Sequence, residues 1–227
     1  MRRTVLFLLL AASAAAKYLA PGAVDVAALV PPPPPAGSIA EEADLLAARL
    51  FAANRTEAQA ALARRYERFD IFQMVRPVLG DWANATTLPR LAAFIDELLP
   101  EVRPVTEEAK RAHARPRPHL ALPGLEPAVA RPDGYSYPSG HAAGSAMFAV
   151  LLRAIDPAHA AEWDAQAELV RLSRLYGGAH FPSDVLAGRR LGEAVGRAVL
   201  ASPALRAQLP ELQAELARAR AAAKPAA

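Results

Sequence analysis

Three short clusters of polar residues in the middle of the chain carry the side chains that phosphate transfer requires. The clusters cover residues 110–118, 138–141 and 173–184. Lysine and arginine bind phosphate oxygens through their positive charge. Histidine can give or take a proton near neutral pH, because its reference pKa is about 6.5. The combination predicts a phosphoryl-transfer site.

His180 and Asp184 form the sharpest pair, because they lie four positions apart at a predicted helix start. Side chains at that spacing meet on a helical turn. A carboxylate that accepts from one ring nitrogen fixes the tautomer and leaves the other nitrogen free to attack. We therefore expect His180 to be a nucleophile that Asp184 orients. In the alternative interpretation, Asp184 is only a charge at a helix N-terminus.

Ser139, Gly140 and His141 stand at the start of an alanine-rich segment that reads as a helix. Free N–H groups at a helix start attract an anion, and glycine lets a phosphate approach the backbone closely. We expect Ser139 and Gly140 to bind phosphate, with His141 as a general acid and base at the edge of the site. The alternative is an ordinary Ser139 N-cap beside an exposed histidine.

Lys110, Arg117 and Arg174 supply the positive charge of the predicted site. Arg117 lies in a proline-interrupted stretch whose stiff backbone can hold a guanidinium in place for two phosphate oxygens. Arg174 falls in the last turn of a predicted helix, where it points into the site or, alternatively, caps helix carbonyls. Three neighbouring arginines are interpreted as solvated surface residues: Arg103, Arg111 and Arg115.

Helix signals follow one another from residue 38 onward and would position these clusters. Capping boxes begin at Ser38 and Thr56, and proline marks most of the later helix starts. Alternating β-branched strands are absent, so residues 38–227 are predicted to form one all-α bundle of about eight helices. The later helices are expected over residues 88–99, 106–114, 139–155, 157–176, 182–200 and 203–222.

The N-terminal 37 residues differ from the rest of the chain. Residues 1–16 carry two arginines followed by thirteen uncharged residues, the form of a secretory signal peptide. A membrane anchor is the alternative, but a spanning helix needs about 20 apolar residues. Residues 17–37 contain five consecutive prolines and are predicted to form an extended arm laid over the domain, with a flexible stalk as the alternative. The expected location is periplasmic or secreted.

The composition narrows the classes of function. The chain is 53% hydrophobic, enough for one sizeable core, and it has no cysteine, which excludes disulfides, thiolate catalysis and zinc sites with cysteine ligands. Without residues 1–16 the net charge is +1, which gives no support for nucleic-acid binding. The apolar segment 142–152 ends at Arg153, too short for a bilayer, so no membrane insertion is expected after signal cleavage.

The three clusters resemble the three-part signature of the type 2 phosphatidic acid phosphatase (PAP2) and vanadium haloperoxidase superfamily, with every signature position filled. The matching residues are Lys110, Arg117, Pro118, Pro138, Ser139, Gly140, His141, Ser173, Arg174, His180 and Asp184. Within that superfamily the chain is most similar to the bacterial class A non-specific acid phosphatases. Those proteins are exported, soluble, all-helical and metal-independent.

This resemblance implies roles for individual residues. His180 would attack phosphorus to form a phosphohistidine, Asp184 would orient it, and His141 would protonate the leaving alcohol and later activate water. The implied phosphate ligands are Lys110, Arg117, Ser139, Gly140 and Arg174. No metal or cofactor is implied. The expected partners are small phosphate monoesters and inorganic phosphate, with phosphotransfer as a further activity and self-association left open.

Two other functions are compatible with the same residues. A vanadium-dependent haloperoxidase would hold vanadate in the phosphate position, although such enzymes are usually much longer. A non-catalytic periplasmic phosphate- or anion-binding module would need the positive charges but not a histidine paired with Asp184. Turnover of a phosphate ester separates the phosphatase from the binding module, and a trapped phosphohistidine separates it from both.

Overall fold

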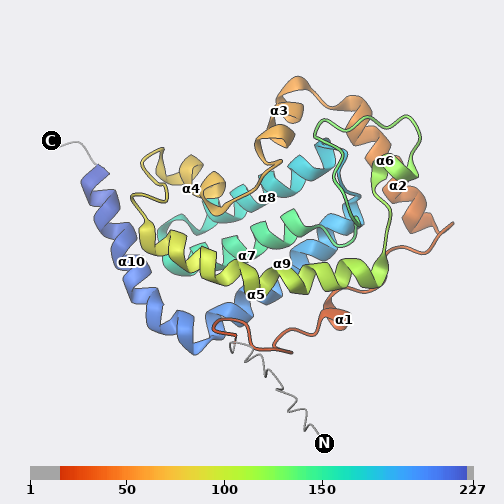
Figure 1. The fold of residues 1–227 in the computed structure, drawn as a ribbon. Helices are drawn as coiled ribbons and strands as arrows, with labels where there is room; N and C mark the ends of the chain where they lie inside the picture. The colour runs from red at the N-terminus through yellow and green to blue at the C-terminus, as the bar shows by residue number, and fades with distance from the viewer. Residues whose placement is uncertain (1–15, 224–227) are drawn as a thin grey trace, which may run out of the picture.

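A computed structural model describes residues 16–223 of the chain, and the predicted signal peptide lies outside the described residues except for Ala16. All regular elements of the described part are helices and it contains no strand, so the predicted all-α fold is confirmed (Figure 1). Its elements are α1 Val26–Leu29, α2 Ile39–Asn54, α3 Glu57–Arg65, α4 Ile71–Leu79, α5 Pro89–His113, α6 Pro118–Ala121, α7 Gly140–Ile155, η1 Pro157–His159, α8 Ala160–Tyr176, α9 Pro182–Ala201 and α10 Pro203–Ala223.

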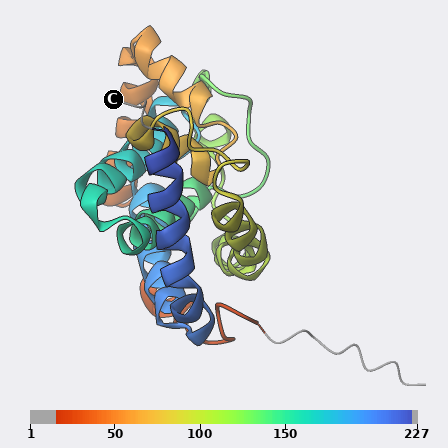
Figure 2. The same ribbon diagram turned by 90° about the vertical axis from the view of Figure 1, so that its left-hand side faces the viewer.

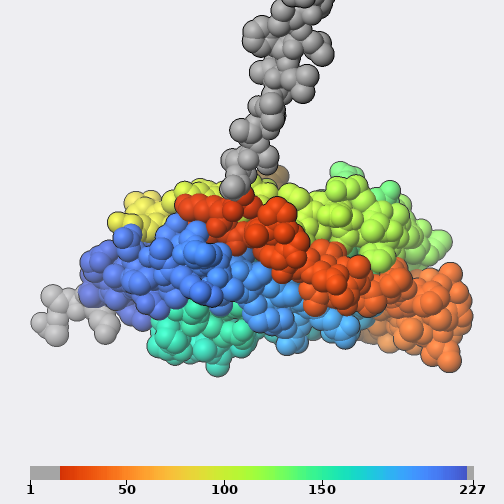
Figure 3. Space-filling view, turned by 90° about the horizontal axis from the view of Figure 1, so that it is seen from below, coloured from red at the N-terminus to blue at the C-terminus, as the bar shows by residue number. Residues whose placement is uncertain are grey.

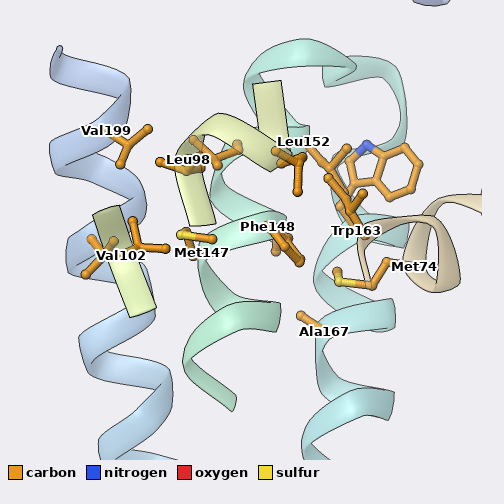
Figure 4. Close-up of a cluster of buried hydrophobic side chains, with 14 of the residues drawn as sticks. Met74, Leu98, Val102, Met147, Phe148, Leu152, Trp163, Ala167 and Val199 are labelled. Carbon is orange, nitrogen blue, oxygen red and sulfur yellow. The ribbon is translucent and has the colours of Figure 1, made fainter. Parts of the chain in front are cut away.

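Helix α7 forms the centre of the bundle, with α8 and α9 beside it and α5 crossing in front (Figure 1). Its alanines and large apolar residues are almost all buried. Figure 4 shows Met147 and Phe148 of α7 packed among Leu98 of α5 and Trp163 of α8. Burial of this apolar surface is the main force that holds the helices together.

Glycines on α9 allow it to approach α7 very closely. A Cβ atom at Gly192 would collide with the carbonyl of Ala143, and one at Gly188 would collide with the carbonyl of Ser139. The close approach brings the starts of the two helices together, and the Ser139 N–H donates to the Asp184 carbonyl at 2.9 Å. Two of the three predicted clusters therefore meet because α9 is glycine-rich.

Helix α5 is longer than expected, because the two predicted helices 88–99 and 106–114 are one continuous helix. Pro100 and Pro104 lie inside it, each removing one helical hydrogen bond. Both prolines are exposed, while Leu98 and Val102 are buried on the opposite face. Packing of this apolar face outweighs the local cost of the prolines, and Lys110 sits in the last turn of the helix.

Short elements were harder to foresee. Helices α1, α4 and α6 were not predicted, although Asp70 and Gln73 form a reciprocal capping box at the start of α4. The box expected at Thr56 is present with Gln59. Helix α10 closes the end of the bundle away from α2 and α6 (Figures 1 and 2).

The segment 17–37 lies along the surface of the bundle and crosses α9 and α5 (Figure 3). The backbone N–H groups of Lys17, Tyr18 and Leu19 all donate to the Glu101 carboxylate, and the Tyr18 ring is buried. The Glu101 carboxylate on α5 thus binds the start of this segment to the bundle. Across residues 16–223, no helix combines the length and the apolar character needed to cross a bilayer.

Candidate active site

His180 lies in the turn between α8 and α9, and its side chain is buried with an exposed fraction of 3%. Gly178 allows the sharp reversal there, because its φ of 66° is unfavourable for residues with a side chain. The His180 Nδ1 lies 3.3 Å from Oδ2 of Asp184. The predicted pair is therefore in contact, with Nδ1–H as the donor and Nε2 left unprotonated.

Asp184 is fully buried and accepts hydrogen bonds from several directions. Its Oδ2 accepts from the Ser136 hydroxyl at 2.5 Å and from the Phe181 N–H at 2.8 Å, and its Oδ1 accepts from Arg115 at 2.8 Å. Burial raises the pKa of this carboxyl, but the hydrogen bond from His180 and the charge of Arg115 outweigh it and lower the pKa. Asp184 is thus held ionised and rigid beside the imidazole.

The three predicted cations converge on the same place. Arg117 donates to Nε2 of His180 at 3.0 Å and to the carbonyl of Ala179 at 3.1 Å. Lys110 donates to the Tyr135 carbonyl at 2.6 Å. Burial and the charge of Arg117 lower the pKa of Lys110 to about 8 and that of Arg174 to about 10. Mutual repulsion of this kind is relieved by a bound anion.

Arg174 has a buried donor that no acceptor in the described part of the chain satisfies. Its Nη1 donates to the Tyr66 carbonyl at 3.3 Å, while its buried Nε has no hydrogen-bond partner among residues 16–223. A buried guanidinium donor without an acceptor is costly. An oxyanion in the site would supply the acceptor, which agrees with the inward orientation expected for this residue and not with helix capping.

The α7 start differs in one detail from the sequence-based expectation. Ser139 is the N-cap, and its hydroxyl accepts from Ala142, but its own N–H is bonded to Asp184 and is not free for phosphate. The N–H groups of Gly140 and His141 lie in the first turn, where no helical carbonyl is available to them. Of the two amides expected to bind phosphate, that of Ser139 is therefore already engaged, whereas the amides of Gly140 and His141 have no helical acceptor.

His141 is not the exposed residue of the alternative interpretation. Its Nε2 lies 3.2 Å from the Glu67 carbonyl, which places a proton on Nε2 and leaves Nδ1 as the nitrogen that titrates. Burial and the charge of Arg174 lower its pKa to about 3, and burial also lowers the pKa of His180 to about 3. Both imidazoles are therefore neutral when the site holds no anion.

Arg115 was wrongly expected to be a solvated surface residue. Its side chain is 8% exposed, bridges Asp184 and Asp44 at 2.8 Å and 2.9 Å, and stacks over the ring of Phe181 at 4.1 Å. Asp44, on α2, also accepts from the N–H of Ser183 at 3.0 Å. Arg103 and Arg111 are exposed, as expected.

A sequence signal for Arg115 did exist. Arg115 and Arg117 each precede a proline, which restricts both to extended backbone. Residues two apart on an extended strand face the same side, so an inward Arg117 implies an inward Arg115. Asp44 and Ser136 carry no comparable signal, because only the folded chain brings α2 and the loop before α7 to the site. His113, just before this stretch, contacts the Val30 carbonyl at 3.2 Å and faces the N-terminal arm.

The buried charges of the site do not cancel. Lys110, Arg115, Arg117 and Arg174 contribute four positive charges, and Asp44 and Asp184 contribute two negative ones, all on buried side chains. The excess of two matches the charge of a phosphate ester dianion. Within residues 16–223 no group of histidine, aspartate and glutamate side chains has the arrangement of a metal site.

Comparison with known proteins assigns the chain to one family. The model of the PAP2 superfamily matches residues 91–207, which include all three clusters. A non-specific acid phosphatase of Salmonella typhi is 31% identical over 153 residues, covering 65% of this chain and 61% of the relative. The chain thus spans less than two thirds of the length of that curated relative.

Two further matches come from more distant proteins. An undecaprenyl-diphosphatase of Sulfolobus acidocaldarius is 44% identical over 73 residues, covering 30% of this chain and 32% of the relative. The crystal structure of a transmembrane PAP2-type phosphatidylglycerolphosphate phosphatase from Bacillus subtilis superposes with a TM-score of 0.47 at 22% identity, covering 72% of this chain and 86% of that one.

Proposed function

The chain belongs to the PAP2 superfamily, and we propose that it is an exported acid phosphatase that hydrolyses phosphate monoesters of broad structure through a phosphohistidine. The observation that carries the proposal is the buried pair in which Asp184 accepts from Nδ1 of His180 while Arg117 donates to Nε2 of the same ring. A protein that only binds anions needs the cations but has no use for an oriented, unprotonated imidazole nitrogen. Export rests on the signal-like residues 1–16, and the name of the Salmonella relative supports the activity.

The first half of the reaction transfers the phosphoryl group to His180. The phosphate oxygens accept from Arg117, and this frees the lone pair on Nε2 that Arg117 otherwise contacts. Nε2 then attacks phosphorus, the ester P–O bond breaks, and the leaving oxygen takes a proton from His141. Lys110, Arg117 and Arg174 stabilise the charge on the transferred group, the term on which phosphoryl transfer mainly depends.

The second half returns the enzyme to its starting state. His141, now neutral, takes a proton from water as the water oxygen attacks phosphorus and the P–N bond breaks. Inorganic phosphate leaves, and His180 is again neutral at Nε2 with its Nδ1–H on Asp184. If an alcohol replaces water in this step, the same residues perform phosphotransfer.

His141 must become protonated when the substrate binds. Without an anion, burial and Arg174 keep its pKa at about 3. A bound phosphate dianion offsets the charge of Arg174, so it raises the pKa of His141 toward the range in which the ring can act as an acid. This coupling favours protonated His141 only in the enzyme–substrate complex and at acidic pH.

The test is hydrolysis of p-nitrophenyl phosphate by the purified protein with a chelator present, followed by rapid quench with labelled substrate in alkali. We expect turnover and a labelled, alkali-stable adduct that His180→Ala lacks. If His180→Ala keeps most of the activity, or if the wild-type protein gives no turnover, the proposal is wrong.

A further inference from the structure

The first residues of the N-terminal arm (residues 17–37) are bound by two carboxylates that lie one helical turn apart on α5. Oε1 of Glu101 accepts the backbone N–H of Lys17 at 2.8 Å. Its Oε2 accepts those of Tyr18 at 2.8 Å and Leu19 at 2.9 Å. Glu97 accepts from Nζ of Lys17 at 2.6 Å and from the Tyr18 hydroxyl at 2.7 Å. One carboxylate thus binds three consecutive backbone donors.

Packing of the next two side chains fixes the register of these contacts. The Tyr18 ring is 1% exposed and lies edge-on to Phe94, with 5.2 Å between the ring centroids. The Tyr18 hydroxyl also accepts from Nε2 of Gln208 on α10 at 3.0 Å, and Leu19 is buried beside it. A shift of the arm by one residue would remove the large aromatic ring from the core. The backbone nitrogen of Lys17 is therefore held at the carboxylate.

The charges of this site are unequal while Lys17 is an internal residue. Glu97 and Glu101 carry two negative charges, and the ε-ammonium group of Lys17 supplies one positive charge, which pairs with Glu97. Among the contacts of residues 16–223, the hydrogen-bond donors to Glu101 are neutral backbone groups. A charged donor binds a carboxylate about twice as strongly as a neutral one. As the first residue, Lys17 would place a second ammonium group 2.8 Å from Oε1 of Glu101.

The sequence offers more than one cleavage position for the predicted signal peptide. Alanines at positions 14 and 16 allow a cut that leaves Lys17 as the first residue. Alanines at positions 12 and 14 allow a cut that leaves Ala15 as the first residue. Only the first cut puts a free amino group on Glu101, where it balances the two carboxylates.

The arm that begins at this site ends beside the candidate active site. It runs along the surface across α9 and α5 (Figure 3). At its other end the Pro31 carbonyl accepts from the Tyr137 hydroxyl at 2.6 Å, and the Val30 carbonyl lies 3.2 Å from Nε2 of His113. Tyr137 lies just before α7, and His113 shares the last turn of α5 with Lys110. A firmly bound start of the arm therefore supports the neighbours of the proposed phosphate ligands.

We propose that Glu101 is the receptor for the N-terminus that removal of the signal peptide creates, with cleavage between Ala16 and Lys17 and the new α-ammonium group bound to the carboxylate. The inference rests on the export that is part of the proposed function, because it requires removal of residues 1–16. Maturation then completes a site that the uncleaved chain fills with neutral donors.

The first test is the N-terminus of the mature protein. The full chain is expressed in a bacterium that has a periplasm, the protein is purified from that compartment, and its mass and N-terminal sequence are determined. A chain that begins at Lys17 supports the proposal, and a chain that begins at any other residue overturns it.

The second test compares two forms of the protein, one beginning at Lys17 and one at Ala15, made from cleavable fusions that leave no added residue. Glu101→Gln keeps an acceptor but removes the charge, so it should lower Tm by about 2 to 4 °C more in the form that begins at Lys17. Glu97→Gln is the matched control, because its partner, the ε-ammonium group of Lys17, is present in both forms. If Glu101→Gln, like Glu97→Gln, has the same effect in both forms, the receptor assignment is wrong.

The pKa of the Lys17 α-amino group gives a measurement that a merely structural contact would not change. A carboxylate in contact favours the charged amine, so this pKa should lie above its usual value of about 7.7 to 8.0. NMR of protein labelled with ¹⁵N-lysine should show the pKa falling by about half a unit or more in Glu101→Gln. An unchanged pKa contradicts the ion pair.

Failure of this inference and failure of the proposed function give different results. If p-nitrophenyl phosphate is hydrolysed but the mature protein begins at another residue, the phosphatase activity stands and the receptor assignment fails. If the mature protein begins at Lys17 and Glu101→Gln distinguishes the two forms, but p-nitrophenyl phosphate is not hydrolysed, the activity fails and the receptor assignment stands.

Discussion

Replacement of Arg115 by methionine tests whether the buried ion network, and not the motif residues alone, maintains the site. Methionine keeps much of the volume and the contact with Phe181 but removes the charge that Asp44 and Asp184 share. Removing one partner of a buried ion pair costs about 3 to 5 kcal/mol. Both carboxylates keep other donors, Ser183 for Asp44 and Ser136 for Asp184, so we expect about 3 kcal/mol.

A double-mutant cycle with Asp44→Asn isolates the interaction. Asp44→Asn alone removes hydrogen bonds to a charged group, worth about 2 kcal/mol, and leaves Arg115 paired with Asp184. In the double variant residue 44 is uncharged, so removing Arg115 leaves no unpaired charge there. We therefore expect the free energy of unfolding to fall by about 3 kcal/mol in the double variant, which corresponds to a coupling energy near 2 kcal/mol between the two residues. The free energies of unfolding come from urea denaturation.

Arg153→Met serves as the control, because Arg153 pairs with Asp164 on the surface, where both side chains are more than 40% exposed. An exposed pair contributes about 1 kcal/mol at most. If the losses in Arg115→Met and Asp44→Asn add to within about 0.5 kcal/mol, or if Arg115→Met behaves like the control, the network does not exist as described.

The pH dependence of kcat distinguishes an effect of Arg115 on Asp184 from a general loss of folding stability. Arg115 lowers the pKa of Asp184, so its loss raises that pKa and moves the acid limb of kcat to higher pH. Arg115→Lys should recover part of the shift because it restores the charge. A variant that is merely less stable would lose activity equally across the pH range in which it remains folded.

Two further predictions concern the histidines. His141→Ala should slow kcat most for esters with poor leaving groups, because a good leaving group needs no proton; equal losses for p-nitrophenyl and alkyl phosphates would contradict the role. The folded-state pKa of His141 and His180 is about 3, below the unfolded value of about 6.5. The unfolded chain therefore binds more protons between these values, and stability should fall as pH drops through this window. Calorimetric Tm values from pH 7 to 4 should show the fall and its reduction by inorganic phosphate; a flat profile would refute the low pKa values.

The sequence predicted the helical class and the motif residues of the site because both depend on local spacing. His180 and Asp184 are four apart, so a helical turn alone brings them together. The continuous α5 could not be predicted in the same way, since Pro100 and Pro104 argue locally for a break and only the packing of Leu98 and Val102 opposes it. The role of Asp44 could not be predicted from the sequence for a related reason. It reaches the site through the placement of α2, and no spacing along the chain encodes that placement.

The excess positive charge connects the fold to its ligand. Burial lowers the pKa values of Lys110, Arg117 and Arg174, and the charge of Arg117 lowers those of Lys110 and Arg174 further. The Asp44–Arg115–Asp184 chain does not relieve the repulsion between these cations, because its own net charge is only −1. The rigid frame that places these groups must therefore be stabilised by packing elsewhere, chiefly the close contact of α7 with the glycine face of α9. A ligand that supplies two negative charges removes the repulsion, and its binding stabilises the folded state by an amount that grows with the logarithm of its concentration over its Kd. The charges that repel one another in the site thus select a dianionic phosphate.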